Sequence, residues 1–193
     1  MLRTDFKRIP RLSTARMELR ALRDSDAADV FRLRASPAVM RHIPKPIGTR
    51  QEEGLQLVRE FHHAAAGGNA IMWAITVKGS DVLLGYIGFW RILKEHHRAE
   101  IGYALHPDLW GQGLMSEAVA AVVDHGFRKI GLHSVEAAVT PDNAASIHVL
   151  EHNGFVLEGH LRENILVNGI FRDTLVFTRH ATARASHPAT QSP

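Results

Sequence analysis

The chain contains no cysteine. This absence excludes a disulfide framework, a thiolate nucleophile and a cysteine-based metal site. The chain also lacks any apolar run near the roughly 20 residues that a membrane-spanning helix needs. Its basic N-terminus, residues 1–10, has no apolar core of the kind found in signal peptides. These absences favour a cytoplasmic protein.

A large charge of one sign is missing as well, because the net charge is only +3 over 193 residues. A nucleic-acid or ribosome contact remains one interpretation of the early basic residues, and it would show a steep salt dependence. No series of base-stacking aromatic residues accompanies them, so a solvated arm is the favoured interpretation. The basic residues in question are Arg3, Lys7, Arg8, Arg11, Arg16, Arg20 and Arg23.

The first third of the chain predicts one strand and two helices. Polar and apolar residues alternate over 16–21, as in a half-buried strand. The acids at 24–26 suit the positive end of a helix, with Phe31 as its apolar anchor and Pro37 after its end. A second helix is predicted over 51–66. Its apolar stripe is Leu55, Val58 and Phe61.

The rest of the chain alternates between strand-like and helix-like segments. Runs of β-branched and aromatic residues predict strands, and apolar residues at helical spacing predict helices. The dipeptide Asn168-Gly169 is a strong signal for a hairpin turn. The predicted strands are 70–78, 82–92, 98–105, 134–139, 155–162 and 170–178. The predicted helices are 113–130 and 143–153.

This order predicts an α/β protein with a mixed central β-sheet flanked by helices in one domain. We expect a basic arm at 1–12, the domain at 13–180 and a disordered tail at 181–193. The unit 98–139 is predicted to be a parallel strand–helix–strand crossover. Its carboxyl edge is where an open α/β sheet binds a ligand.

A glycine-bearing turn joins the strand that ends at Leu105 to the helix that starts near Leu114. A helix that begins this way points free backbone N–H groups and the positive end of its dipole at one place. Such a place binds phosphate, and Gly111 and Gly113 let a phosphate approach the backbone closely. The segment therefore predicts a ligand that carries a pyrophosphate.

Four segments together resemble the GNAT superfamily of acyl-CoA N-acyltransferases over residues 12–178. Within it, the chain is most similar to the ribosomal-protein N-terminal acetyltransferases, the RimJ/RimL type. The pyrophosphate loop of the family begins with Gln or Arg, whereas this chain has Asp108, so a side-chain contact to phosphate is not expected there. The four segments are Arg16–Arg20, Ala99–Leu105, Trp110–Ala118 and Asn143–Phe155.

The resemblance implies that acetyl-CoA is the acetyl donor, and it implies where acetyl-CoA binds. Backbone groups of Tyr103, Ala104 and Leu105 are expected to pair with the pantetheine amides like an added strand. Asn143 and Ser146 are expected to approach the pantetheine and the sulfur, although Asn143 also suits a helix cap. The pyrophosphate is expected on backbone N–H groups of Gly111, Gln112, Gly113, Leu114, Met115 and Ser116.

Acetyl transfer to an amine needs a base that removes a proton and a group that assists the departing thiolate. Glu100 is the first choice for the base and Glu136 the second, with a structural ion pair as the alternative for each. Glu117 is interpreted as an acid of the first helical turn or as a structural hydrogen-bond acceptor. The short cofactor helix contains no tyrosine, which leaves Ser146 or water to assist the thiolate. In the family, attack on the thioester is direct, and the absence of cysteine agrees with that.

Histidine is abundant, with 13 residues, and histidine is a common ligand of zinc. His148 and His152 stand four residues apart, a spacing that suits zinc on a helix. No third ligand is evident from spacing, and we expect no metal.

The sequence therefore predicts an N-acetyltransferase that acts on a primary amine, with a protein N-terminal α-amine favoured. Small amines such as antibiotics or polyamines are the alternative acceptors. A non-catalytic acyl-CoA-binding or ribosome-associated module is the alternative of another class. A homodimer is expected through the last hairpin, where Ile165, Val167 and Ile170 suit a sheet edge. No membrane partner is expected.

Overall fold

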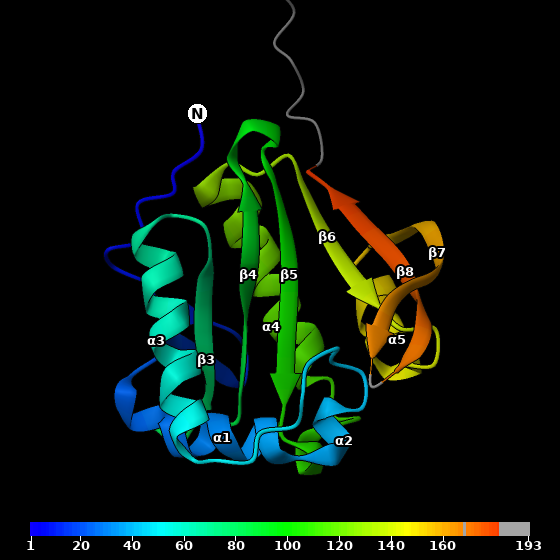
Figure 1. The fold of residues 1–193 in the computed structure, drawn as a ribbon. Coiled ribbons are helices and arrows are strands. Elements are labelled where there is room, and N and C mark those ends of the chain that lie inside the picture. The colour runs from blue at the N-terminus through cyan, green and yellow to red at the C-terminus, as the bar shows by residue number, and fades with distance from the viewer. Residues whose placement is uncertain (168, 182–193) are drawn as a thin grey trace, which may run out of the picture.

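The computed structural model describes residues 1–167 and 169–181. It contains one eight-stranded sheet in the order β1-β2-β3-β4-β5-β6-β8-β7 (Figure 1). Only the β5–β6 pair is parallel, and the other neighbours are antiparallel. The strands are β1 (Leu12–Ser13), β2 (Met17–Ala21), β3 (Ile71–Val77), β4 (Gly85–Leu93), β5 (Arg98–Leu105), β6 (Ser134–Val139), β7 (Val156–Val167) and β8 (Ile170–His180).

Helices cover both faces of this sheet. In Figure 1, α3 lies in front of β3 and α4 lies behind β4 and β5. The mixed sheet with flanking helices confirms the predicted fold class. The helices are α1 (Ala27–Ala35), α2 (Pro37–Met40), α3 (Glu52–Ala66), α4 (Leu114–His125) and α5 (Ala144–His152), with single helical turns at Asp24–Asp26, Lys94–His96, Pro107–Leu109 and Gly126–Ile130.

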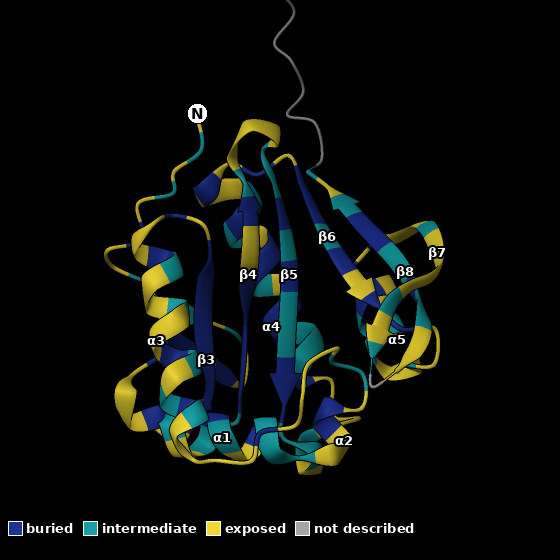
Figure 2. Cartoon of the chain, in the orientation of Figure 1, coloured by how far each residue is buried: buried dark blue, intermediate teal, exposed yellow. Residues whose placement is uncertain are grey.

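The sheet separates two apolar cores. The larger core joins the sheet to α4 and α5 and includes the fully buried Trp73 and Phe89. The smaller core joins it to α1 and α3 through Val30 and Val58. Strand β3 is buried on both faces from Ile71 to Thr76, which Figure 2 shows as an unbroken dark ribbon. Strand β3 therefore contributes to both cores.

Several predicted details of the elements are wrong. Phe31 is only half-buried, and Val30 and Leu33 anchor α1 instead. Leu55 lies outside the apolar stripe of α3, where Leu57 takes its place. The predicted helix 113–130 is confirmed in its extent, but its last turn, Gly126–Ile130, is π-helical and not α-helical.

Two further differences concern the connections. A short helix, α2, begins at Pro37 because proline suits the first position of a helix, and this helix was not predicted. The predicted hairpin is present but longer, since β7 runs to Val167 and β8 to His180. Asn168 of the predicted turn and residues 182–193 of the predicted tail lie outside the described residues.

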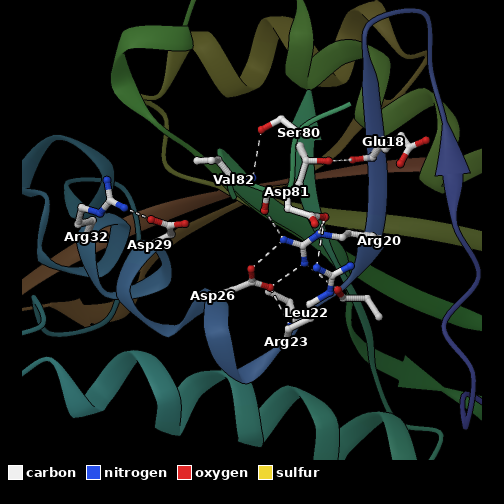
Figure 3. Close-up of polar contacts among 12 residues, drawn as sticks. Glu18, Arg20, Leu22, Arg23, Asp26, Asp29, Arg32, Ser80, Asp81 and Val82 are labelled. Carbon is white, nitrogen blue, oxygen red and sulfur yellow. Dashed lines mark hydrogen bonds and ion pairs between the residues drawn. The ribbon is translucent and has the colours of Figure 1, made fainter. Parts of the chain in front are cut away.

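A buried ion pair fixes the start of α1 to the sheet (Figure 3). The guanidinium of Arg20 donates two hydrogen bonds of 2.8 Å to the two carboxylate oxygens of Asp26. It also donates a 2.7 Å bond to the carbonyl oxygen of Asp81 in the β3–β4 connection. The side chains of Arg20 and Asp26 are only 4% and 5% exposed. Three segments therefore meet at one buried charge pair.

The N-terminal arm is packed against the domain rather than free of it. Phe6 is buried in the larger core, and the indole Nε1 of Trp73 donates a 2.8 Å hydrogen bond to the carbonyl of Pro10. None of the helices in the described part of the chain has both the length and the hydrophobicity that a bilayer span needs.

Candidate functional site

Strands β5 and β6 are paired at only three positions, from Arg98 with Ser134 to Glu100 with Glu136. Beyond these positions the strands diverge, as Figure 1 shows. Strand β4 stays paired with β5 as far as Leu105, so β5 remains straight. In the described residues, the β6-facing backbone edge of 101–105 therefore has no strand partner. A ligand with amide groups can pair with such an edge.

The loop after β5 is held in an open shape by its own side chains. The indole Nε1 of Trp110 donates a 2.9 Å hydrogen bond to the carbonyl of Leu105, and Gln112 Nε2 donates one of 3.1 Å to the carbonyl of Asp108. The carboxylate of Asp108 is 85% exposed. It therefore points to solvent.

The loop ends in a backbone conformation that suits an anion. Gly111 and Gly113 have φ angles of 72° and 74°, which favour glycine. A Cβ on Gly111 would have no heavy atom within 4 Å, so space is open beside it. No side chain caps the following helix, so the N–H groups of Gly113 to Ser116 are free of helical partners. This arrangement fits a pyrophosphate.

Arg16, the residue before β2, holds this loop in place. Its Nε donates a 2.6 Å hydrogen bond to Glu117 Oε1, and its Nη2 donates a 2.9 Å bond to the carbonyl of Gln112. Burial opposes ionisation of Glu117, but hydrogen bonds from Thr14 and Arg16 outweigh it and lower the pKa of Glu117. Glu117 is thus a structural acceptor, as predicted. The role of Arg16 was missed, since its partner is 101 residues away.

Two carboxylates lie side by side on the face that looks away from α4. Glu100 and Glu136 are register partners on β5 and β6. Arg91 Nη2 donates a 2.8 Å hydrogen bond to Glu100, and Arg98 forms an ion pair with Glu136. A bulge at Trp90 brings Arg91 opposite Glu100.

The environment of Glu100 raises its pKa. Burial is the main cause; Arg91 opposes it and the nearby Glu136 adds to it. The Glu100 side chain is 13% exposed, against 21% for Glu136. A carboxylate with a raised pKa is a better proton acceptor. Both carboxylates form the ion pairs that were the alternative expectation for them. The identity of the partners was not predicted, since a bulge sets the position of Arg91 and strand pairing sets that of Arg98.

Helix α5 approaches β5 from the other face. Asn143 caps α5, since its Oδ1 accepts a 3.2 Å hydrogen bond from the N–H of Ser146. The hydroxyl oxygens of Ser146 and Tyr103 lie 2.7 Å apart. Burial raises the pKa of Tyr103 to about 12, and the bond with Ser146 opposes that rise. The structure therefore brings together Tyr103 and Ser146, which are 43 residues apart.

Two contacts tie α5 to its surroundings. Asn153 Nδ2 donates a 2.9 Å hydrogen bond to Ser116 Oγ, which joins the end of α5 to the start of α4. The Nδ1 atom of His42, just after α2, lies 3.1 Å from Thr140 Oγ1 and 3.4 Å from Asp142 Oδ1. The segment after α2 thus contacts the turn that leads into α5. Both contacts were missed, since neither has a signal in local sequence.

The histidine pair on α5 was the strongest metal candidate in the sequence. The rings of His148 and His152 are 6.3 Å apart. Within residues 1–167 and 169–181, no group of three or more His, Asp or Glu side chains could hold a metal ion.

Comparisons with known proteins agree with this geometry. Residues 16–156 match the model of the acetyltransferase (GNAT) domain family. The uncharacterized N-acetyltransferase YoaA of Bacillus subtilis is 34% identical over 88% of this chain and 96% of its own length. The ribosomal protein uS5-alanine N-acetyltransferase of Escherichia coli is 28% identical over 84% of this chain and 87% of its own. A spermidine N(1)-acetyltransferase of Vibrio cholerae is 25% identical over 82% of this chain and 90% of its own length.

One similar solved structure contains bound coenzyme A. The crystal structure of RimL, a ribosomal-protein α-N-acetyltransferase, in complex with coenzyme A superposes with a TM-score of 0.81 at 26% identity. The superposition covers 89% of this chain and 98% of the RimL chain. The family match, the open loop before α4 and the divergence of β5 from β6 lead to one conclusion: this chain belongs to the GNAT family and is an N-acetyltransferase that uses acetyl-CoA as its donor.

Proposed function

We propose that the acceptor is the α-amine of a protein N-terminus, of the kind found on ribosomal proteins. The observation that carries this proposal is the pairing of both carboxylates with arginines, Glu100 with Arg91 and Glu136 with Arg98. The face that receives the acceptor therefore lacks the excess negative charge that a polyamine would favour. An α-amine has a pKa of about 8, so it loses its proton more easily than an alkyl amine with a pKa near 10.

The donor is bound chiefly by backbone groups in this proposal. The unpaired edge of β5 pairs with the amides of the pantetheine arm, and the free N–H groups before α4 hold the pyrophosphate. The amide of Asn143 reaches the pantetheine with its Nδ2, because its Oδ1 caps α5. The backbone ligands are those of Tyr103, Ala104, Leu105, Gly111, Gln112, Gly113, Leu114, Met115 and Ser116.

Glu100 accepts the proton of the acceptor amine, directly or through a water molecule. Its raised pKa supports this role, and its ion pair with Arg91 fixes the carboxylate in place. Glu136 is the second candidate. Ser146 lies at the first turn of α5 and donates a hydrogen bond to the departing thiolate of CoA. The acetyl group passes directly from sulfur to nitrogen, without an acyl-enzyme.

A homodimer and a cytoplasmic location are part of the same proposal. Strand β7 is the edge of the sheet, and the distal hairpin exposes apolar side chains. Leu166, Ile170 and Phe171 are each about 60% exposed, and a partner would cover them. Analytical ultracentrifugation tests the dimer: a single species of 21.4 kDa at assay concentration would overturn it.

A comparison of three acceptors, each assayed separately, tests the proposed function. The protein is incubated with acetyl-CoA and one of three amines: a peptide that begins with alanine, the same peptide with a blocked α-amine and an internal lysine, or spermidine. We expect mass spectrometry to show acetylation of the free α-amine at the highest kcat/KM. Preferential acetylation of spermidine would establish the small-amine alternative. Binding of acetyl-CoA without transfer to any amine would favour the non-catalytic alternative. The variant Glu100→Gln is the control for catalysis.

A further inference from the structure

The side-chain hydroxyls of Tyr103 and Ser146 are in contact, and neither hydroxyl is needed for the proposed binding of acetyl-CoA by backbone groups. The contact joins β5 to α5, the helix that follows β6, at an oxygen–oxygen distance of 2.7 Å. Tyr103 packs against the larger core, with its ring among apolar neighbours. The backbone N–H of Ser146 is already held by the cap residue Asn143. Ser146 is therefore held at two points, its backbone N–H and its hydroxyl oxygen.

The chemistry of the two hydroxyls sets the direction of this hydrogen bond. A phenol is a stronger acid than an aliphatic alcohol, so it is the better donor of the two. Burial keeps Tyr103 protonated throughout the working pH range, because it raises the pKa to about 12. When Tyr103 donates to Ser146, the single serine proton is free for a third partner. Hydrogen bonds in such a chain strengthen one another.

We propose that Tyr103 is a positioning residue that directs the hydroxyl proton of Ser146 to the sulfur of CoA as the thiolate departs. This inference rests on the proposed role of Ser146. The amine nitrogen forms its bond to the acetyl carbon, the carbon–sulfur bond breaks, and the electron pair goes to sulfur. The amine proton goes to Glu100. The serine donates a hydrogen bond to the sulfur anion and keeps its own proton, so the charge balance is complete.

The kinetic test uses three variants, Tyr103→Phe, Ser146→Ala and the double variant. Loss of the serine donor is expected to lower kcat by roughly 100-fold, as for removal of one hydrogen-bond donor to a developing negative charge. Loss of the tyrosine hydroxyl is expected to lower kcat roughly tenfold, the value of one hydrogen bond. The double variant should match Ser146→Ala, because Tyr103 acts only through the serine. The KM for acetyl-CoA should stay unchanged.

The chain offers a matched control in its only other tyrosine, Tyr86. Tyr86 is also buried, but it lies in the smaller core between the sheet and α1 and α3. Tyr86→Phe removes the same atom at a distance from the divergence, so its kcat should equal that of the unchanged protein. Thermal melting of each variant shows whether the fold is kept.

A binding measurement tests the contact with the sulfur without turnover. Calorimetry compares the affinity for CoA with that for desulfo-CoA between pH 7 and 9.5, across the ordinary thiol pKa of about 8.5. The unchanged protein should prefer CoA increasingly as the thiol ionises. Tyr103→Phe and Ser146→Ala should each reduce this preference at high pH roughly tenfold, whereas Tyr86→Phe should keep it.

Two results would overturn the inference while the proposed function stands. One is a Tyr103→Phe variant with the kcat and the CoA preference of the unchanged protein. The other is a double variant in which the two losses in kcat multiply, which would show that Tyr103 acts independently of the serine. If the unchanged protein transfers no acetyl group, the proposed function fails. The pH-dependent preference for CoA still tests the hydroxyl pair in that case.

Discussion

Replacing Arg16 by glutamine is expected to weaken acetyl-CoA binding while the protein remains folded. Arg16 contacts the loop at two points, the carboxylate of Glu117 at 2.6 Å and the carbonyl of Gln112 at 2.9 Å. Gln112 lies between the two glycines with left-handed backbone. Without the arginine, the loop samples other conformations, and the free N–H groups are no longer arranged in advance for the pyrophosphate.

The magnitude follows from the exposure of the contact. A hydrogen bond to a charged group contributes about 1.5–3 kcal/mol when buried. Here the side chains of Arg16 and Glu117 are 48% and 27% exposed, so solvent screening reduces the value towards the 0.2–1 kcal/mol typical of surface pairs. A combined loss of about 1–2 kcal/mol raises the KM for acetyl-CoA roughly 5- to 30-fold. The kcat should change little, since Arg16 touches no reacting group.

The assay measures initial rates over a range of acetyl-CoA concentrations at saturating acceptor. Arg11→Gln is a matched control, because Arg11 forms a comparable ion pair with Glu18 on the same region of the sheet, 3.3 Å long and with no contact to the loop. The reasoning is refuted if Arg16→Gln keeps the KM of the control variant. It is also refuted if the variant loses kcat alone.

Three other predictions follow from buried or tightly held groups. Asp26→Asn should destabilise the fold by about 3–5 kcal/mol because the Arg20 charge stays buried without its partner, which calorimetric melting measures against the exposed control Asp24→Asn. Glu100 accepts a proton only when ionised, and burial raises its pKa from 4.5; kcat/KM should therefore fall as the pH drops through a value above 4.5, and Glu100→Gln should abolish this limb of the pH profile. Asn153→Ala removes the bond between α5 and α4, so the variant should lose about 1–3 kcal/mol of stability, and a variant as stable as the unchanged protein in urea would contradict this.

Much of the fold was predictable because its signals are local. The strands at 98–105 and 134–139 have the predicted bounds, since short apolar runs between turn residues define them. The cap at Asn143 follows from one side chain and the backbone three residues later. The tight turn before α4 follows from Gly111 and Gly113, because glycine permits the positive φ that the turn has at both positions.

The remaining features depend on contacts between distant segments. The bulge at Trp90 decides which arginine meets Glu100, and no periodicity marks a single extra residue. Arg16 reads as an ordinary strand residue until its partner Glu117 is placed beside it. Tyr103 was predicted to act through its backbone, and nothing near it in the sequence indicates the contact of its hydroxyl with Ser146 on α5. These are tertiary relations, and a pattern along the chain carries no information about them.

The most direct test of the central claim is a calorimetric titration of the protein with acetyl-CoA, repeated with the variant Gly111→Trp. Gly111 has open space beside it and a backbone that disfavours other residues, so tryptophan would fill the place proposed for the pyrophosphate. We predict saturable binding with a Kd of roughly 1–100 μM, which the variant loses although a cooperative melting transition shows that it is still folded. Absence of binding, or binding that survives in the variant, would contradict the account.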